Sequence, residues 1–275
     1  MLPTEIYKSR YGQEKVNFFR TTESAETVHP FLILPSGELL REEVGVNEVD
    51  VLSITSSGQI LDYVALLQAQ GLLNNAHLVD YNPAQNWYVA YLLTQAVLAK
   101  EKGIDIRRRV FNTTKDEIQG ILEGKLLELF PEFEGHLELF PWLSAEKVAE
   151  IFICREIPEA NDEWKDMPEL FSSNGFEHSY FFLHNPRLFE SLVEAADSRK
   201  IRFFQGSIED FSHPSGGNYH VVYLADAHWT TGEKMAALLD REMYDRGFCQ
   251  ISCFGEGCLS LIDFYKKDHV FLELL

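Results

Sequence analysis

Short apolar runs alternate with amphipathic stretches along most of the chain, beginning near residue 46. The run Val49–Thr55 is rich in β-branched residues and ends at Ser56-Ser57-Gly58, which predicts a strand followed by a tight loop. Leucine, valine and alanine then recur at near-helical spacing from Leu61, and Gly71 marks the expected end of that helix. Ala76–Asp80 is the next predicted strand. The order strand, helix, strand is typical of an α/β unit.

The same alternation continues after residue 80 and returns after residue 200. Pro83 suits the first turn of a helix that continues from Trp87 to Lys102 and ends at Gly103. The remaining predicted elements are strands at Ile201–Phe204, Tyr219–Leu224 and Phe248–Phe254 and a helix at about Gly232–Arg246. Because strands that alternate with helices pair in parallel through right-handed crossovers, the pattern predicts an open, doubly wound, mostly parallel α/β sheet of the Rossmann-like kind.

The centre of the chain, residues 104 to 200, departs from this rhythm. It carries helical patches at Lys115–Phe130 and Ser144–Ile153, separated by joints rich in proline and asparagine. We expect a helical insertion here that covers a site rather than extending the sheet. The expected organisation is a lead-in or cap at residues 1–45, followed by one α/β domain at residues 46–275 that contains the insertion.

Ligands of open α/β sheets lie outside the carboxyl ends of the strands, so the loops after the predicted strands are the candidate sites. Gly58 would let the backbone approach a ligand, and the next helix would offer N–H groups to a carboxylate; a simple turn glycine is the alternative. Asp80 ends the second strand 22 positions later, a spacing at which such folds bind ribose hydroxyls. A helix N-cap or a solvent-facing loop acid is the alternative for Asp80. The G-x-G-x-x-G motif is absent, which disfavours a nicotinamide or flavin cofactor.

Two stretches between Val51 and Gln85, VLSITSSGQILDYVALL and HLVDYNPAQ, resemble the S-adenosylmethionine-binding half of class I methyltransferase-fold proteins. More narrowly, they are similar to the 3-amino-3-carboxypropyltransferases of betaine-lipid synthesis. That family pairs a serine-and-glycine first loop with an aspartate-x-asparagine-proline-alanine-glutamine second loop, and Asp80–Gln85 matches the second loop. The resemblance implies that S-adenosyl-L-methionine is the cofactor. Its expected contacts in these loops are Ser57 and Gly58 near the methionyl part, Asp80 at the ribose, and also Ser56, Asn82 and Gln85.

Two later loops fit this arrangement. Ser207 and Ile208 follow a predicted strand, where the fold would place groups at the edge of the adenine, one through its backbone and one through apolar packing. The loop Leu224–Trp229 resembles the family's leucine-serine-aspartate loop, and Asp226 is a further cofactor-binding candidate. Asp226 and His228 are the candidate catalytic residues, since a histidine titrates near neutrality and suits a general base. A structural histidine packed beside Trp229 is the alternative for His228.

The resemblance implies transfer of the 3-amino-3-carboxypropyl group to a small-molecule or neutral-lipid acceptor. Methyl transfer to a small molecule is a second interpretation, because the sulfonium centre activates all three attached carbons and orientation selects among them. A third is a non-catalytic cofactor-binding protein of the same fold, since the family's N-terminal tyrosine, tryptophan and paired-acid signature is not evident. The segment Asn174–Tyr180 is a candidate for acceptor recognition. Arg107-Arg108-Arg109 is either a solvated face or a site for an anionic group.

Composition narrows the partners and the location. The 275 residues carry 24 Lys and Arg against 43 Asp and Glu, a net charge of −19, which would repel a phosphate backbone and disfavours nucleic acid as a partner. The N-terminus has no apolar signal segment, and no apolar run is long enough for a transmembrane segment. We therefore expect a cytoplasmic protein with reduced cysteines. Cys249, Cys253 and Cys258 lack the spacing of a zinc site, so no metal is expected.

Overall fold

The structure is a computed structural model, and it describes residues 34–55, 58–106, 113–136, 144–146, 148–149, 180–224, 232–252 and 259–265. In chain order, its elements are α3 (Gly37–Leu39), η1 (Leu40–Val44), β1 (Val49–Ile54), α4 (Ile60–Ala69), β2 (Leu73–Asp80), α5 (Pro83–Lys102), α7 (Lys115–Glu123), α8 (Lys125–Leu129), η2 (Pro131–Phe133), η5 (Phe181–Leu183), α12 (Pro186–Asp197), β3 (Ile201–Gln205), η6 (Ile208–Asp210), β4 (Tyr219–Tyr223), α13 (Gly232–Glu242), β5 (Met243–Ser252) and β6 (Leu259–Tyr265).

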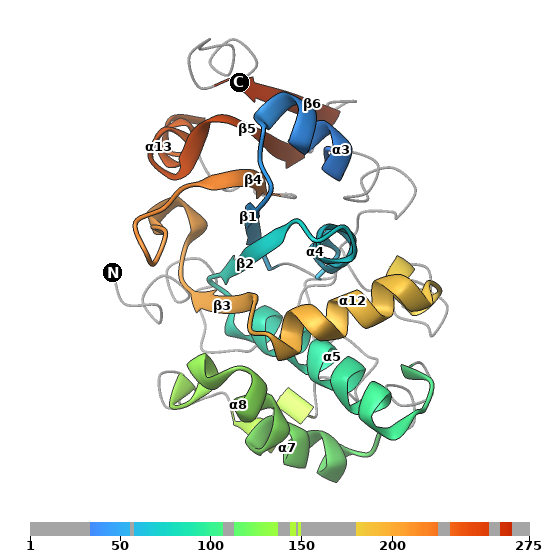
Figure 1. Ribbon diagram of the computed structural model, residues 1–275. Helices are drawn as coiled ribbons and strands as arrows, with labels where there is room; N and C mark the ends of the chain where they lie inside the picture. Colours follow the sequence, from blue (N-terminus) through green and yellow to red (C-terminus); the bar gives the residue numbers. More distant parts are fainter. Residues whose placement is uncertain are drawn as a thin grey trace.

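The strands form one six-stranded sheet in the order β3-β2-β1-β4-β5-β6. Strands β3, β2, β1, β4 and β5 pair in parallel, and β6 runs antiparallel to β5 at one edge. In Figure 1 the sheet passes through the middle of the molecule, from β3 near the bottom to β6 at the top. The predicted mostly parallel α/β sheet is therefore confirmed.

Helices cover both faces of this sheet, as a doubly wound arrangement requires. Figure 1 shows α4 and α12 on one side of the strands and α13 on the other. Successive residues of β1 point to opposite faces, as the two-residue period of a strand dictates. Val51 joins the larger apolar core with residues of α4, α5 and α12, whereas Leu52 joins a smaller core with Leu238 and Leu239 of α13.

The sequence analysis does not predict the helix α12, because Pro186 indicates a joint between elements there. It stands at the first helical position, where its fixed φ is favourable and its missing N–H costs nothing. The Asn185 side chain accepts hydrogen bonds from the N–H groups of Arg187 (3.0 Å) and Leu188 (3.3 Å), which completes an N-cap. This part of the predicted insertion packs against α4 and α5 and so belongs to the helical layer of the sheet. The covering role of the rest stays a prediction.

Several element boundaries also differ from the prediction. The helical patch Lys115–Phe130 is two helices, because the chain breaks at Gly124 between α7 and α8. The helix predicted to reach Arg246 ends at Glu242, and β5 begins at the next residue. Strand β6 had no counterpart in the prediction. Half of the patch Ser144–Ile153, residue 147 and residues 150–153, lies outside the described residues.

The chain returns from its central segment to the first turn of α4. Asp62 is fully buried there, and its carboxylate accepts hydrogen bonds from the N–H groups of Phe181 (2.8 Å) and Phe182 (2.7 Å). Charged acceptors of this kind make the stronger protein hydrogen bonds. The bidentate contact fixes η5 beside the amino-terminal end of α4.

Candidate functional site

The strand order reverses direction between β1 and β4. From β1 the chain proceeds outward to β2 and β3, and from β4 it proceeds the other way to β5 and β6. Ligands of open α/β sheets bind in the crevice at the carboxyl ends of the strands at such a point. The register pairs Ser53 with Tyr223, Ile54 with Val79, and Asp80 with Gln205, so the ends of four strands meet at this edge.

The loop after β1 contains Gly58, whose φ is +85°. An L side chain is strained in this left-handed region, and a Cβ here would lie 3.0 Å from Val89 Cγ2 on α5. Gly58 donates its N–H to Thr55 O (2.9 Å) and accepts from the N–H of Leu61 (3.0 Å), which joins the end of β1 to the start of α4. Backbone conformation and packing against α5 therefore both require glycine. Its neighbours Ser56 and Ser57 lie outside the described residues.

The sequence interpretation did not single out Gln59, the residue that precedes the first turn of α4. Its side chain makes no capping hydrogen bond and is only 4% exposed. Its amide nitrogen Nε2 is buried and has no hydrogen-bond partner among the residues that the structure describes. An unsatisfied buried donor costs about 1–3 kcal/mol, so this position is suited to an acceptor atom from outside the chain. No sequence signal marks it beyond its place after the glycine.

Asp80 lies at the carboxyl end of β2 and is 5% exposed. Its Oδ1 accepts the N–H of Asn82 at 2.9 Å, an Asx-type turn. Its backbone oxygen accepts the N–H of Gly206 at 2.9 Å from the end of the neighbouring strand β3. The carboxylate is thus held inside the edge of the sheet, and the solvent-facing alternative is wrong.

Asn82 and Gln85 form the entry to α5, and both are buried, at 1% and 4% exposed. Pro83 occupies the first helical position between them, and the N–H of Gln85 donates to Asn82 O at 3.2 Å. The segment Asp80–Gln85 therefore forms one compact turn that leads from the strand into the helix. Contacts of Asn82 and Gln85 with a cofactor stay a prediction.

A chain of buried polar side chains runs behind this turn, and the sequence interpretation did not foresee it. Thr55 at the end of β1 donates its hydroxyl to Asn86 Oδ1 at 2.6 Å. Asn86 on α5 in turn donates through Nδ2 to Phe204 O at 3.1 Å and to Gln205 Oε1 at 3.2 Å. Gln205 donates through Nε2 to Tyr81 O at 2.7 Å. The chain links the ends of β1 and β3 through α5.

Ser207 and Ile208 follow β3 directly and are 7% and 6% exposed. Ile208 starts η6, and its side chain packs in the smaller apolar core with Leu52 and Val79. The Ser207 carbonyl accepts the N–H of Asp210 at 3.2 Å. Both residues lie at the carboxyl edge next to Asp80, while their expected contact with an adenine stays a prediction.

The candidate catalytic residues Asp226 and His228 lie outside the described residues, as does Trp229. They follow β4, whose last residue, Tyr223, is paired with β1 at the switch point. Of the residues Asn174–Tyr180, the structure describes Tyr180 alone, and Arg107-Arg108-Arg109 is also outside.

Cys249 is 1% exposed on β5, and burial raises the pKa of its thiol, so it stays protonated. Cys253 and Cys258 lie outside the described residues. Within the described ranges, no cluster of three or more His, Cys, Asp or Glu residues is arranged to hold a metal. In the same ranges, no helix has both the length and the apolar character needed to cross a membrane.

Buried histidines on the sheet and beside its edge, among them His77 and His136, are held neutral by their surroundings. His77 on β2 is 3% exposed and its Nδ1 is hydrogen-bonded to the hydroxyl of Tyr219 at 2.5 Å. Burial lowers the pKa of His77 to about 4, and the nearby His213 acts in the same direction. Burial also lowers the pKa of His136 to about 4, although a side-chain hydrogen bond with Gln205 acts in the opposite direction.

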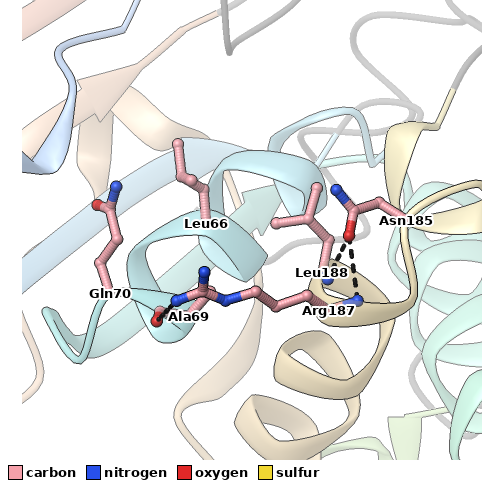
Figure 2. A pocket seen from close by; sticks show the side chains of 6 residues that line it. All are labelled: Leu66, Ala69, Gln70, Asn185, Arg187 and Leu188. Carbon is pink, nitrogen blue, oxygen red and sulfur yellow. Dashed lines mark hydrogen bonds between the residues drawn. The ribbon is translucent and has the colours of Figure 1, made fainter.

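A surface hollow of about 350 Å³ lies elsewhere on the molecule (Figure 2). It is formed by the last turns of α4 and the first turn of α12, where Arg187 donates to Ala69 O at 3.1 Å. The ten residues of α4 separate it from the carboxyl edge by about 15 Å, at 1.5 Å per residue. We assign no role in the candidate site to this hollow.

Comparisons with known proteins add no assignment. A scan against models of protein families gives no match, and a search of curated proteins finds none with significant similarity. The case for a function therefore depends on the residues at the carboxyl edge of the sheet.

Proposed function

We propose that the chain is an S-adenosylmethionine-dependent transferase of the class I methyltransferase type, and that it transfers the 3-amino-3-carboxypropyl group. The observation that carries this proposal is the position of Asp80. Its carboxylate is buried at the end of β2, next to the strand β1 that borders the switch point. Folds of this kind use an acidic residue here for ribose hydroxyls. The match of Asp80–Gln85 to the family's second loop narrows the proposal further.

The other residues at this edge suit the proposed cofactor. S-adenosyl-L-methionine carries a carboxylate, a ribose diol and an adenine but no pyrophosphate, so a glycine-rich pyrophosphate motif is not needed. Gln59 combines a buried amide donor, which has no acceptor in the described part of the chain, with the amino-terminal end of α4, and both favour a carboxylate. Asp80 would accept hydrogen bonds from the ribose hydroxyls. Ser207 and Ile208 are the proposed neighbours of the adenine.

When bound, the cofactor supplies a sulfonium whose three attached carbons are open to nucleophilic attack. The protein then has to orient an acceptor toward one of these carbons, and orientation supplies much of the acceleration. We place Asp226 and His228 on the acceptor side, with His228 taking a proton from a hydroxyl or ammonium acceptor. The net charge of −19 favours an uncharged or cationic acceptor. A cytoplasmic location is part of the same proposal.

The experiment that tests the proposal identifies the by-product. The purified protein is incubated with the cofactor and with acceptors that include diacylglycerol in neutral micelles. Methylthioadenosine supports aminocarboxypropyl transfer, whereas S-adenosylhomocysteine alone overturns that assignment and indicates methyl transfer. Cofactor binding with neither by-product indicates a non-catalytic binding protein. Failure to bind the cofactor in calorimetry overturns the whole proposal.

A further inference from the structure

A hydrogen-bonded chain extends the polar chain behind the candidate site into the central segment. Trp87 on α5 donates its indole N–H to His136 Nδ1 at 3.0 Å. His136 follows η2, and its side chain is also hydrogen-bonded to that of Gln205 at the end of β3. Both Trp87 and His136 are buried, at 1% and 7% exposed. His136 therefore links the central segment to the carboxyl edge of the sheet.

The partners of His136 fix the direction of each hydrogen bond. Because the indole N–H can only donate, Nδ1 must accept, and in a neutral imidazole the proton then resides on Nε2. Burial keeps the ring neutral, since it lowers the pKa of His136 to about 4. His136 accordingly donates to Gln205 Oε1. This leaves Gln205 Nε2 as the donor to Tyr81 O at 2.7 Å, and the carboxamide of Gln205 is held in one orientation.

The peptide group between Tyr81 and Asn82 is held at both of its polar ends. Its carbonyl oxygen accepts from Gln205 Nε2, and its N–H donates to Asp80 Oδ1 at 2.9 Å. If Gln205 were released, this peptide group could rotate, and the hydrogen bond between Asn82 N–H and the Asp80 carboxylate would be weakened. The Tyr81–Asn82 peptide group thus joins the Asp80 carboxylate to Gln205, whose Oε1 is held jointly by His136 and by Asn86 Nδ2 at 3.2 Å.

The segment that carries His136 is held to the sheet at a second point. Glu132 accepts the outward N–H of Phe203 on the edge strand β3 at 2.9 Å. Phe133 packs its ring against Phe203 and Trp87, with centroids 5.3 and 4.8 Å apart. Residues 131 to 136 therefore cover the edge of β3 through apolar contacts as well as through the polar chain. The two kinds of contact can be separated by mutation.

We propose that His136 is a positioning residue that acts through Gln205 and the Tyr81–Asn82 peptide group to hold the Asp80 carboxylate ready for a ribose. The proposal rests on the proposed function for its ligand, whereas its geometric part concerns the protein alone. It makes the central segment a determinant of cofactor affinity, although His136 itself touches no cofactor atom. A ligand or partner that displaces residues 131 to 136 would loosen the cofactor site.

Two substitutions at one position separate the polar link from packing. In His136→Asn the amide oxygen can replace Nδ1 as the acceptor for Trp87, but the side chain is too short to reach Gln205. In His136→Gln the longer side chain can place a donor N–H where Nε2 was. Phe133→Leu is the matched control, because it loosens the same aromatic cluster and leaves the polar chain intact.

The first readout is amide hydrogen exchange of the full chain without cofactor. The N–H of Asn82 reports the turn, and the N–H of Ala76, which donates to Lys200 O at the other end of β2, reports global opening. We expect His136→Asn to speed exchange at Asn82 roughly five- to tenfold relative to Ala76, the scale of one lost hydrogen bond. His136→Gln should restore most of the protection. Equal acceleration at both amides, or the same effect in Phe133→Leu, would overturn the proposal.

The second readout is the affinity for S-adenosyl-L-methionine by calorimetry. His136→Asn should weaken binding by about the same factor as it speeds exchange at Asn82, and Phe133→Leu should not. Faster exchange with unchanged affinity would overturn the role of His136 at the cofactor site. A wild-type protein that binds no cofactor would overturn the proposed function instead, and the exchange experiment would still decide whether His136 holds the turn.

Discussion

Substitution of Asp80 probes the cofactor site most directly, because the structure separates its role in the turn from its proposed role in binding. Within the turn, its Oδ1 accepts one backbone N–H at 2.9 Å. Asp80→Ala removes that bond and the charge. Asp80→Asn keeps an oxygen for the N–H of Asn82 but replaces the rest of the carboxylate with a donor. The two variants should therefore differ in stability and agree in their effect on binding.

The expected magnitudes follow from hydrogen-bond energies. Loss of the turn bond should lower the free energy of unfolding of Asp80→Ala by about 1 kcal/mol, whereas Asp80→Asn should stay close to the wild type. Hydrogen bonds to a charged group contribute about 1.5–3 kcal/mol each. Affinity for S-adenosyl-L-methionine should thus fall roughly 10- to 150-fold in Asp80→Ala. It should fall at least about tenfold in Asp80→Asn, at the lower end of that scale.

Urea denaturation gives the first quantity and isothermal titration calorimetry the second. A thermal shift on adding cofactor serves as a check, because a ligand that binds only the folded state raises its stability by mass action. Wild-type affinity in both variants, with the fold intact, would remove Asp80 from the site and refute the argument. Equal loss of stability in both variants would show that the turn depends on the charge rather than on the single hydrogen bond.

Three further predictions concern the frame of the site. Gly58→Ala should lower the free energy of unfolding by about 1–2 kcal/mol, because alanine is strained at this left-handed backbone position. Adding Val89→Ala should recover only the part of this loss that comes from contact between the new Cβ and Val89. Full recovery would contradict the argument from backbone conformation. Asp62→Ala should cost at least about 2 kcal/mol in urea denaturation, because two backbone N–H groups lose a buried charged acceptor; a cost below about 0.5 kcal/mol would refute the role of this contact. Because burial lowers the pKa of His77 and of His136 to about 4, against about 6.5 when unfolded, the unfolded chain binds more protons between these values. Stability should therefore be retained above pH 6.5 and fall as the pH drops toward 4, by up to about 1.4 kcal/mol per pH unit for each group. If the free energy of unfolding falls just as steeply with decreasing pH in the double variant His77→Phe, His136→Phe, other groups cause the loss of stability in acid.

The inner strands β1, β2 and β4 were predictable because they are mostly buried runs separated by helical stretches, whereas the edge strand β6 was missed. Asp80 and Gly58 could be located for the same reason, since Asp80 ends one predicted strand and Gly58 lies in the loop after another. The helix α12 was missed although its signals are local, because a proline is equally typical of a joint, and only the structure shows Asn185 as an N-cap and Pro186 as the first helical residue. The boundary at Glu242 was missed because the sequence shows no glycine or proline there.

The polar chain behind the site could not have been predicted from the sequence. His136 and Trp87 are 49 positions apart, and Asn86 and Gln205 are 119 apart. No periodicity or motif relates such residues, because their contact arises only when α5, β3 and the central segment fold against one another. Gln59 was missed for a related reason, since its isolation from protein acceptors is a property of burial and not of its neighbours in the sequence.

The two hydrogen bonds from η5 to the Asp62 carboxylate have a consequence for re-engineering of the chain. The central segment departs after α5 and is anchored on its return by two backbone N–H groups, which any residue type except proline provides. These two hydrogen bonds exclude only proline, whereas the buried side chains of Phe182 and Leu183 add a requirement for apolar residues. A graft of a different central segment should attach at the same point beside the first turn of α4, provided that the chain enters η5 with these two N–H groups intact. The two N–H groups of η5 are therefore a fixed attachment point for a replacement of the segment between residues 137 and 179.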